Sequence, residues 1–204
     1  MQRSEFVMEE VATLGRSGAA ISAISGYAGG TKVGDNNRVC YHNMQNIADY
    51  GALGHAEVVQ VEIPASALPA FSQRYFSLFG ERGYRHDPQD KGGEYRSLLG
   101  LPGGSDSTYF SVIKSAAANS PMKLFKGEGN EPDTLGSKAV LVMDSNKFPF
   151  FPAEVTPLVA YVYHQFHNDF MGPPYGAAYN KLQLKELEAK RISPTGCPDR
   201  VPTI

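Results

Sequence analysis

The side chain most suited to chemistry is Glu57, in the stretch LGHAEVVQVEI at positions 53–63. From position 59 to 63, apolar and polar residues alternate with the period of a half-buried strand. The same register places Glu57 on the apolar face. An ionised carboxylate is costly to bury without a partner, so we expect Glu57 to hold its proton and act as an acid. His55 could form an acid–base pair with Glu57. Alternatively, Glu57 is a carboxylate at the edge of the sheet that forms a local salt bridge.

Two other patterns could bind ligands, and each has a simpler explanation. The stretch HQFHND, His164 to Asp169, offers two imidazoles and a carboxylate, and zinc sites do use short His spacings. The sequence lacks a second ligand cluster, so we expect no metal and no other cofactor. The glycine-rich stretches GYAGG (26–30) and GLPGG (100–104) lack the phosphate-binding spacings, so turns are their expected use.

The chain has two cysteines, Cys40 and Cys197. Cys40 in RVCYHN is expected to pack in the interior. Cys197 lies in SPTGCPD, where the flanking Pro and Gly predict an exposed loop, with either an accessible thiol or an incidental surface residue. Two cysteines are too few for a disulfide-stapled secreted scaffold, so a reducing, cytoplasmic location is the default.

Hydrophobic periodicity predicts the elements that must position these residues. We expect helices at 4–14, 65–79, 105–118 and 179–192, with Ser105 or Asp106 capping the third and with the last one charged and mostly solvated. Short strands are expected at 20–25, 56–63, 122–125, 139–143 and 148–151. Strands mixed with helices without a strict βαβ rhythm indicate an α+β fold, with a sheet covered on one side.

Composition limits the function. The 204 residues suffice for one domain with a substantial core. The net charge is -2, and Lys and Arg do not cluster, which argues against a nucleic-acid or anionic-membrane surface. The sequence shows no apolar run long enough to span a bilayer.

Several stretches together resemble the A-type peptide methionine sulfoxide reductases. They are GYAGG, VC, GHAEVVQVEI, HDP, DKGGEYRS, FFPAE and YHQFHNDF, and they occur in the order found in that family. The resemblance covers residues 26–182, and its most specific parts are GHAEVV and the Asp-x-Gly-x-x-Tyr-Arg-Ser pattern. It implies a ferredoxin-like two-layer α/β sandwich over a single domain, 1–204.

The resemblance implies roles for individual residues. Glu57 would be the general acid that protonates the sulfoxide oxygen of methionine S-sulfoxide, free or in a protein, while a thiolate attacks sulfur. Tyr95 would bind that oxygen and Asp90 would support the network around it. Cys197, in the tail at 183–204, would resolve the resulting sulfenic acid as a disulfide, which thioredoxin reduces. This would make the chain a protein-repair oxidoreductase, expected to be monomeric.

The chain departs from the family in three places. Asn36 stands where the family has a second oxygen-binding Tyr, and Tyr41 nearby is the candidate substitute. The nucleophile of the family's Gly-Cys-Phe-Trp motif is missing, and either Glu5 replaces it or the motif lies before Met1. We favour a truncated start, since three residues before Ser4 cannot form the strand that precedes the motif. Thr156 to Val162 is an apparent insertion.

These departures leave two functions open. One is an enzyme whose nucleophile is encoded upstream. The other is a non-catalytic homologue that binds methionine sulfoxide without reducing it. Organelle targeting is compatible with both, and an in-frame strand ending in Gly-Cys-Phe-Trp upstream of Met1 would support the enzyme.

Overall fold

The computed structural model describes residues 3–85, 87, 90–154, 182–192 and 195–198 of the chain. The α-helices in this part of the chain are α1 (Arg3–Leu14), α2 (Leu68–Ser77), α3 (Phe110–Ala117) and α5 (Leu182–Glu188). The strands are β1 (Ile24–Ala28), β2 (Ala56–Gln60), β3 (Leu98–Leu101), β4 (Lys123–Lys126), β5 (Ala139–Asp144) and β6 (Phe151–Pro152). Short 3-10 helices connect them: η1 (Gly18–Ala20), η2 (Asp35–Asn37), η3 (Ala65–Ala67), η4 (Gly93–Tyr95) and η5 (Gly104–Asp106).

The described strands form two small sheets of three strands each. In the first, β1 is central and pairs antiparallel with β2 and β6. In the second, β5 is central and pairs parallel with β3 and β4. The run AVLVMD of β5 is almost continuously apolar because a central parallel strand is covered on both faces. This mixed α/β architecture is compatible with the expected α+β sandwich.

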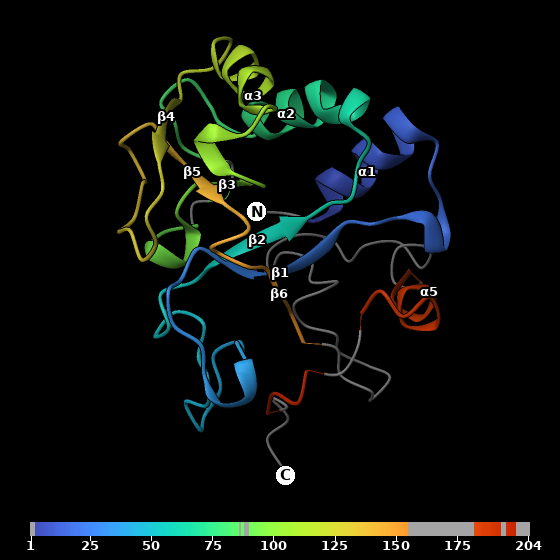
Figure 1. Ribbon diagram of the computed structural model, residues 1–204, viewed down its shortest axis with the longest axis vertical. Coiled ribbons are helices and arrows are strands. Elements are labelled where there is room, and N and C mark those ends of the chain that lie inside the picture. Colours follow the sequence, from blue (N-terminus) through green and yellow to red (C-terminus); the bar gives the residue numbers. More distant parts are fainter. Residues whose placement is uncertain (1–2, 86, 88–89, 155–181, 193–194, 199–204) are drawn as a thin grey trace.

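The largest core lies between the helices and the sheets. Helices α2 and α3 lie together across one side of the strands, and α1 packs against α2 (Figure 1). A smaller apolar cluster lies elsewhere, where the 29–55 loop projects beyond the sheet (Figure 1). This second cluster contains the buried residues Tyr27, Val39, Tyr50 and Ala153. Strand β2 lies between several apolar clusters: its Val59 packs against the largest one, and its Ala56 and Val58 belong to a third cluster that includes Leu98, Leu141 and Met143.

Hydrophobic periodicity located most elements, but strand β1 begins later than predicted. The strand covers 24–28 rather than 20–25, so the first three residues of GYAGG are strand and the turn begins at Gly29, with φ 84°. Gly26 is required by close approach, since a Cβ there would lie 2.2 Å from the carbonyl oxygen of Phe151. Glycine in a strand interior commonly marks such a contact.

Other boundaries also differ from prediction. Strand β2 ends at Gln60, and β6 includes only the last residue of the predicted 148–151 strand. Helix α3 starts at Phe110 because 104–106 forms η5 instead. Neither Ser105 nor Asp106 caps it, since its N-cap residue is Tyr109, which makes no side-chain capping bond.

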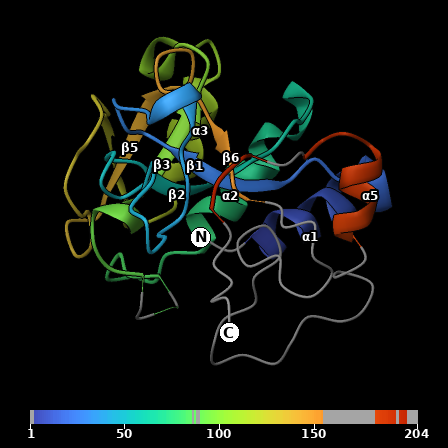
Figure 2. The ribbon, with the colours of Figure 1, turned by 90° about the horizontal axis from the view of Figure 1, so that it is seen from below.

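The predicted solvated helix at 179–192 is described from residue 182, as α5, and it is not solvated throughout. It lies beside η1 (Figure 2). Its Glu186 is fully buried between Arg3 and Arg191. A charged residue was therefore misassigned to the surface.

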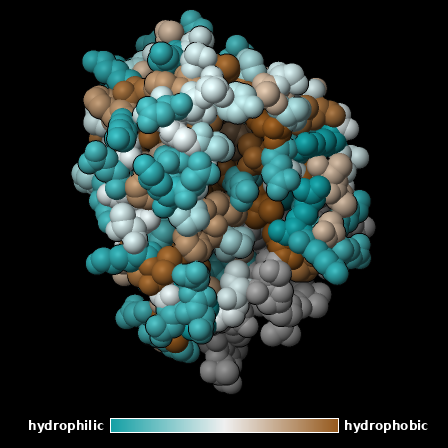
Figure 3. Space-filling model, in the orientation of Figure 1, coloured by the Kyte–Doolittle hydropathy of each residue, from teal (hydrophilic) through white to brown (hydrophobic). Residues whose placement is uncertain are grey.

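On the face shown in Figure 3, hydrophobic residues gather in a band near the middle, between hydrophilic areas. Among the helices that the structure describes, none has both the length and the apolar character needed to cross a bilayer.

Candidate functional site

Glu57 is placed by the pairing of β1 with β2. Its Cα partner across the ladder is Tyr27, so the two side chains project from the same face of the sheet. Tyr27 is buried in the smaller apolar cluster, and Glu57 is partly buried beside it. The predicted inward direction of Glu57 is therefore correct. It faces the smaller cluster, whereas Val59 further along the strand packs against the larger core.

The loop before β2 brings further groups to Glu57. Its two limbs are joined by backbone hydrogen bonds from Cys40 to Ala48 (2.8 Å) and from Tyr50 to Cys40 (2.7 Å). The Tyr50 ring stacks on Tyr27 at 4.6 Å and on Tyr41 at 5.6 Å between centroids. Three tyrosines from separate parts of the sequence thus form one stack whose central member, Tyr50, reaches Glu57.

The Tyr50 hydroxyl is shared by two carboxylates. It lies 3.1 Å from Glu57 Oε1 and 3.2 Å from Glu94 Oε2. Burial raises the pKa of Glu57, and the negative charges of Asp90 and Glu94 raise it further, although the hydrogen bond from Tyr50 opposes this. The carboxyl therefore holds its proton to higher pH than an ordinary glutamate, as the strand pattern predicted.

Tyr95 and Asp90 come from the DKGGEYRS stretch. Tyr95 belongs to η4, which contacts β2, and burial followed by the charge of Glu57 raises the pKa of its hydroxyl. Asp90 Oδ2 lies 3.2 Å from Arg85 Nε, so this carboxylate has a cationic partner. Because η4 contacts β2 and the charges of Glu57 and Asp90 both raise the pKa of Tyr95, these three predicted site residues lie in one region of the structure.

A further carboxylate, Glu154, contacts two of the three stacked tyrosines. Its Oε2 accepts a 2.8 Å hydrogen bond from the Tyr27 hydroxyl, and its Oε1 accepts one from the Tyr41 backbone N–H. Tyr41 is therefore held at the site from two directions, by its ring and by its backbone. Asn36, at the position of the family's second tyrosine, lies on the exposed η2 with φ 58°.

His42 extends the hydrogen-bonded group toward solvent. Its Nδ1 lies 2.7 Å from Asp49 Oδ2 and its Nε2 lies 3.1 Å from Glu94 Oε2. Burial alone would lower the pKa of His42, but the hydrogen bond to Asp49 and the charge of Glu94 raise it overall.

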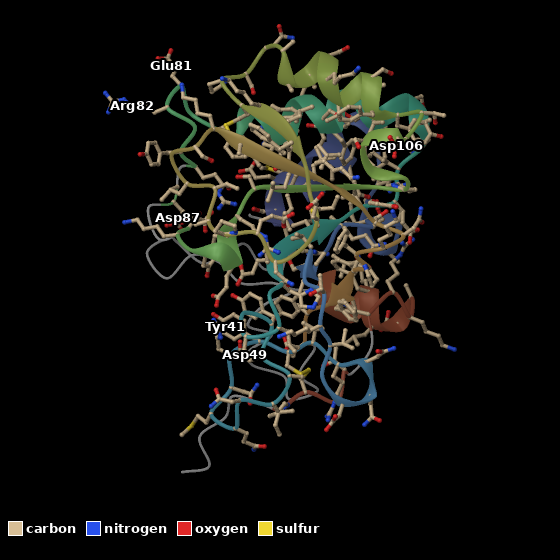
Figure 4. All side chains as sticks on the ribbon, turned by 60° about the vertical axis from the view of Figure 1, so that its left-hand side comes forward. Tyr41, Asp49, Glu81, Arg82, Asp87 and Asp106 are labelled. Atoms are coloured by element: carbon tan, nitrogen blue, oxygen red, sulfur yellow. A yellow bond between two sulfur atoms is a disulfide. The ribbon has the colours of Figure 1, made fainter. Side chains whose placement is uncertain are left out.

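Tyr41 and Asp49 both belong to the projecting loop, while Asp106 lies toward the opposite end of the molecule (Figure 4).

The sequence left Cys197 as either an accessible thiol or an incidental surface residue, and in the structure it is not a free thiol. It forms a disulfide with Cys40, and the two Cα atoms are 5.7 Å apart. Cys40 is buried as expected, but it is bonded rather than merely packed. A ligand atom of Glu154 lies within 4.8 Å of both sulfurs. With the sulfurs joined, this trio lacks the thiolates that zinc needs.

His55 is not the acid–base partner of Glu57. Its Nδ1 accepts the N–H of Gly30 at 3.1 Å, and its Nε2 lies 2.7 Å from the carbonyl oxygen of Lys32 and donates to it. Burial, followed by the charge of Arg96, lowers the pKa of His55 despite the Lys32 hydrogen bond, so the ring is held neutral. Both nitrogens are occupied in fixing the GYAGG turn, which is a structural role.

Glu5 does not stand in for the missing nucleophile. It lies within α1, and its carboxylate pairs with Arg74 of α2. This favours the interpretation in which SEFV is already helix. His164, Asp169 and the stretch from Thr156 to Val162 lie outside the described residues.

Five members of the site were not predicted individually: His42, Asp49, Tyr50, Glu94 and Glu154. Glu94 lies inside DKGGEYRS and Glu154 inside FFPAE, so the motifs contained both without indicating their roles. Tyr50 and His42 lie in a loop without periodicity, where no sequence signal shows which side chains turn inward.

Chemically, the arrangement offers a carboxyl that retains its proton beside several phenol hydroxyls. Such a group can donate hydrogen bonds to a polar oxygen and then transfer a proton to it. Comparison of the chain with protein-family models, with curated proteins and with solved structures finds no match.

Proposed function

We propose that this site recognises the oxygen of methionine S-sulfoxide and belongs to a peptide-methionine (S)-S-oxide reductase. The observation that carries the proposal is the Tyr50 hydroxyl 3.1 Å from the Glu57 carboxyl, whose pKa burial raises, with Tyr95 on η4, which contacts β2. Sulfoxide oxygen is a strong hydrogen-bond acceptor and a poor leaving group. A neutral carboxyl with neighbouring phenols matches both needs, because it donates in the ground state and supplies a proton as the S–O bond breaks.

The motif order supports the same reaction, and with it the ferredoxin-like form of the α+β fold. In the proposed reaction a cysteine thiolate attacks the sulfoxide sulfur, and Glu57 protonates the oxygen. The substrate sulfur is reduced by two electrons to methionine, and the oxygen ends on the cysteine as sulfenic acid. A second thiol condenses with the sulfenic acid, which releases water and leaves a disulfide. A thioredoxin dithiol then reduces this disulfide.

Within the chain as it stands, the described residues can supply the acid and the oxygen-binding groups for this scheme. The remaining requirement is the nucleophile. Both cysteines of the chain, Cys40 and Cys197, are joined to each other. This pairing favours a second candidate function, a protein that binds methionine sulfoxide without reducing it.

Binding measurements test the recognition shared by both candidates. The disulfide form is titrated with the two diastereomers of N-acetylmethionine sulfoxide amide, with the sulfone and with the unoxidised amide, and the chemical shifts of 13C-labelled Glu and Tyr are followed. We expect the S-sulfoxide to bind most tightly and to shift Glu57 and Tyr95. Equal or undetectable binding of all four compounds would overturn the proposal.

Matched variants show whether Glu57 is responsible. Glu57→Gln keeps a hydrogen-bond donor, so binding should weaken only modestly, but its pH dependence should vanish because the titrating group is gone. The control is Glu81→Gln, at an exposed carboxylate distant from the site (Figure 4). It should leave the binding affinity and its pH dependence unchanged. Reductase turnover is then assayed separately, as release of methionine.

A further inference from the structure

We propose that Asp49, His42, Glu94 and Tyr50 form a proton relay that delivers protons from solvent to Glu57. The inference deepens the proposed function and rests on it for its purpose, because each sulfoxide reduced would consume the proton of Glu57. Glu57 is partly buried and must be recharged in every cycle, and a hydrogen-bonded chain of side chains can provide a route for protons from water.

The relay is continuous in the structure. Asp49 Oδ2 to His42 Nδ1 is 2.7 Å, and His42 Nε2 to Glu94 Oε2 is 3.1 Å. The Tyr50 hydroxyl then lies 3.2 Å from Glu94 Oε2 and 3.1 Å from Glu57 Oε1. Every heavy-atom separation lies within or close to hydrogen-bond range, so a proton can cross without movement of the backbone.

The relay is exposed to solvent at His42 and Glu94, and it is buried at Tyr50. The His42 side chain is 38% exposed and that of Glu94 is 34% exposed. Tyr50 is fully buried in its tyrosine stack. Imidazole exchanges protons readily near neutral pH, and its pair with Asp49 favours the charged form that has a proton to give.

The transfer balances in protons. Imidazolium of His42 gives its Nε2 proton to Glu94 Oε2, and the resulting carboxyl donates to the Tyr50 oxygen. The hydroxyl proton of Tyr50 passes at the same time to Glu57 Oε1. Burial and the charges of Glu57 and Glu94 raise the pKa of Tyr50 far above its ordinary value, so Tyr50 is neutral before and after the transfer. His42 ends neutral and regains a proton from water.

Several other titratable or charged groups face the relay and set its electrostatics. They are Tyr27 and Tyr41 of the stack, Glu154, Tyr95, and the Asp90–Arg85 pair beside Glu57. The charge of Asp90 favours a protonated Glu57, and Arg85 is the cationic partner of Asp90. The His42 ring lies between the carboxylates of Asp49 and Glu94. Asp49, His42 and Glu94 recharge the acid rather than contact the substrate.

The test follows the proton directly and needs no sulfoxide, so it is independent of whether the proposed function is correct. The protein is 13C-labelled at Glu, and the carboxyl C=O stretch of Glu57 is assigned by its absence in Glu57→Gln. A rapid pH drop then gives the rate at which Glu57 becomes protonated. We expect the rate to fall at least about tenfold in both His42→Gln and Tyr50→Phe, the order of a lost proton-transfer group.

The control is Tyr109→Phe, an exposed tyrosine at the N-cap of α3, which should leave the rate unchanged. If Tyr50→Phe fails to fold, Glu94→Gln interrupts the same chain at a more exposed position. Unchanged rates in the folded variants would overturn the relay, because Glu57 would then exchange with water directly. Slowing in Tyr50→Phe alone would also overturn it, because His42 would have no part.

Discussion

Two buried glutamates, Glu10 and Glu186, offer a sharp test of how this fold tolerates charge. Both side chains are fully excluded from solvent. Glu10 of α1 accepts the backbone N–H of Ser22 at 2.8 and 3.0 Å, the Ser22 hydroxyl at 3.0 Å and Arg16 Nη1 at 2.8 Å. Glu186 of α5 has only long ion pairs, 3.7 Å to Arg3 and 3.8 Å to Arg191. Neither of its oxygens has a hydrogen-bond partner among the described residues.

The same substitution should therefore change stability by very different amounts at the two positions. Glu10→Gln removes one acceptor from a satisfied buried ion pair and leaves Arg16 without its anion, which costs about 3–5 kcal/mol. For a chain of this size that is roughly 6–20 °C in Tm. Glu186→Gln removes a charge that burial already disfavours, so it should change stability by less than about 1 kcal/mol near pH 5.

The pH dependence of stability distinguishes the Glu186→Gln variant further from the Glu10→Gln variant. Burial raises the pKa of Glu186 to about 7, although Arg3 and Arg191 oppose the rise. A carboxyl pKa above its unfolded value of about 4.5 means that the folded state binds the proton more tightly. The stability it contributes is complete at low pH and is lost as pH rises through about 7. Glu186→Gln should therefore become progressively stabilising, relative to the unsubstituted protein, from pH 5 to pH 8.

Urea unfolding of both variants at pH 5 and pH 8, followed by circular dichroism, measures these differences. Glu10→Gln is the internal control, since its cost comes from lost hydrogen bonds rather than from a raised pKa. Equal losses in the two variants would refute the reasoning, because hydrogen-bond satisfaction would then not distinguish the sites. A Glu186→Gln variant that loses stability as pH rises would show that the ion pairs outweigh burial.

Three further predictions concern the site. The first uses a chain extended to carry a Gly-Cys-Phe-Trp strand, in which Glu57→Gln should slow methionine release in a single turnover by about 10²–10⁴-fold. The melting temperature should change little, and a near-normal first turnover would remove Glu57 from the proposed mechanism. The chain as it stands should show no turnover with dithiothreitol, and turnover that disappears in Cys40→Ser would identify Cys40 as the nucleophile. Reduction of the disulfide, or Cys197→Ser, should lower the free energy of unfolding by roughly 2–5 kcal/mol in urea melts, and unchanged midpoints would contradict a stabilising role.

The inward direction of Glu57 was predictable because a strand displays its side chains with a fixed period. Glu57 falls in register with the apolar residues that follow it, and this single observation predicted its inward direction and its raised pKa. Tyr95 and Asp90 followed from the motif that contains them.

The groups around Glu57 could not be predicted in the same way. Tyr50 and His42 lie in a loop fixed by backbone hydrogen bonds such as Cys40 to Ala48, and by the side chain of Asn43 bonding to the carbonyl oxygens of Tyr41 and Ile47. Such bonds join residues that lie close together in space but at no regular spacing in the sequence. Neither periodicity nor composition therefore reveals them. The Cys40–Cys197 pairing is likewise a long-range contact between segments that are unremarkable locally.

Glu10 and Glu186 illustrate a different limit. Each lies on a helix among other charged residues, where the pattern indicates a solvated face. Their burial depends on Ser22, Arg16 and Arg3, which are contributed by other elements or adjoining loops. Helical periodicity gives the position of a side chain around its own axis, but it does not show what covers it.

The bond between Cys40 and Cys197 has a consequence for how the protein breaks. The two residues are separated by 157 positions, so most of the polypeptide lies inside a single covalent ring. One cut by a protease anywhere in that ring opens it without releasing a fragment. The nicked molecule keeps its full mass on a non-reducing gel and separates into two pieces only after a thiol is added. A single break in the backbone can therefore stay covalently hidden until a reducing environment divides the molecule, whereas a second break would release the segment between the two.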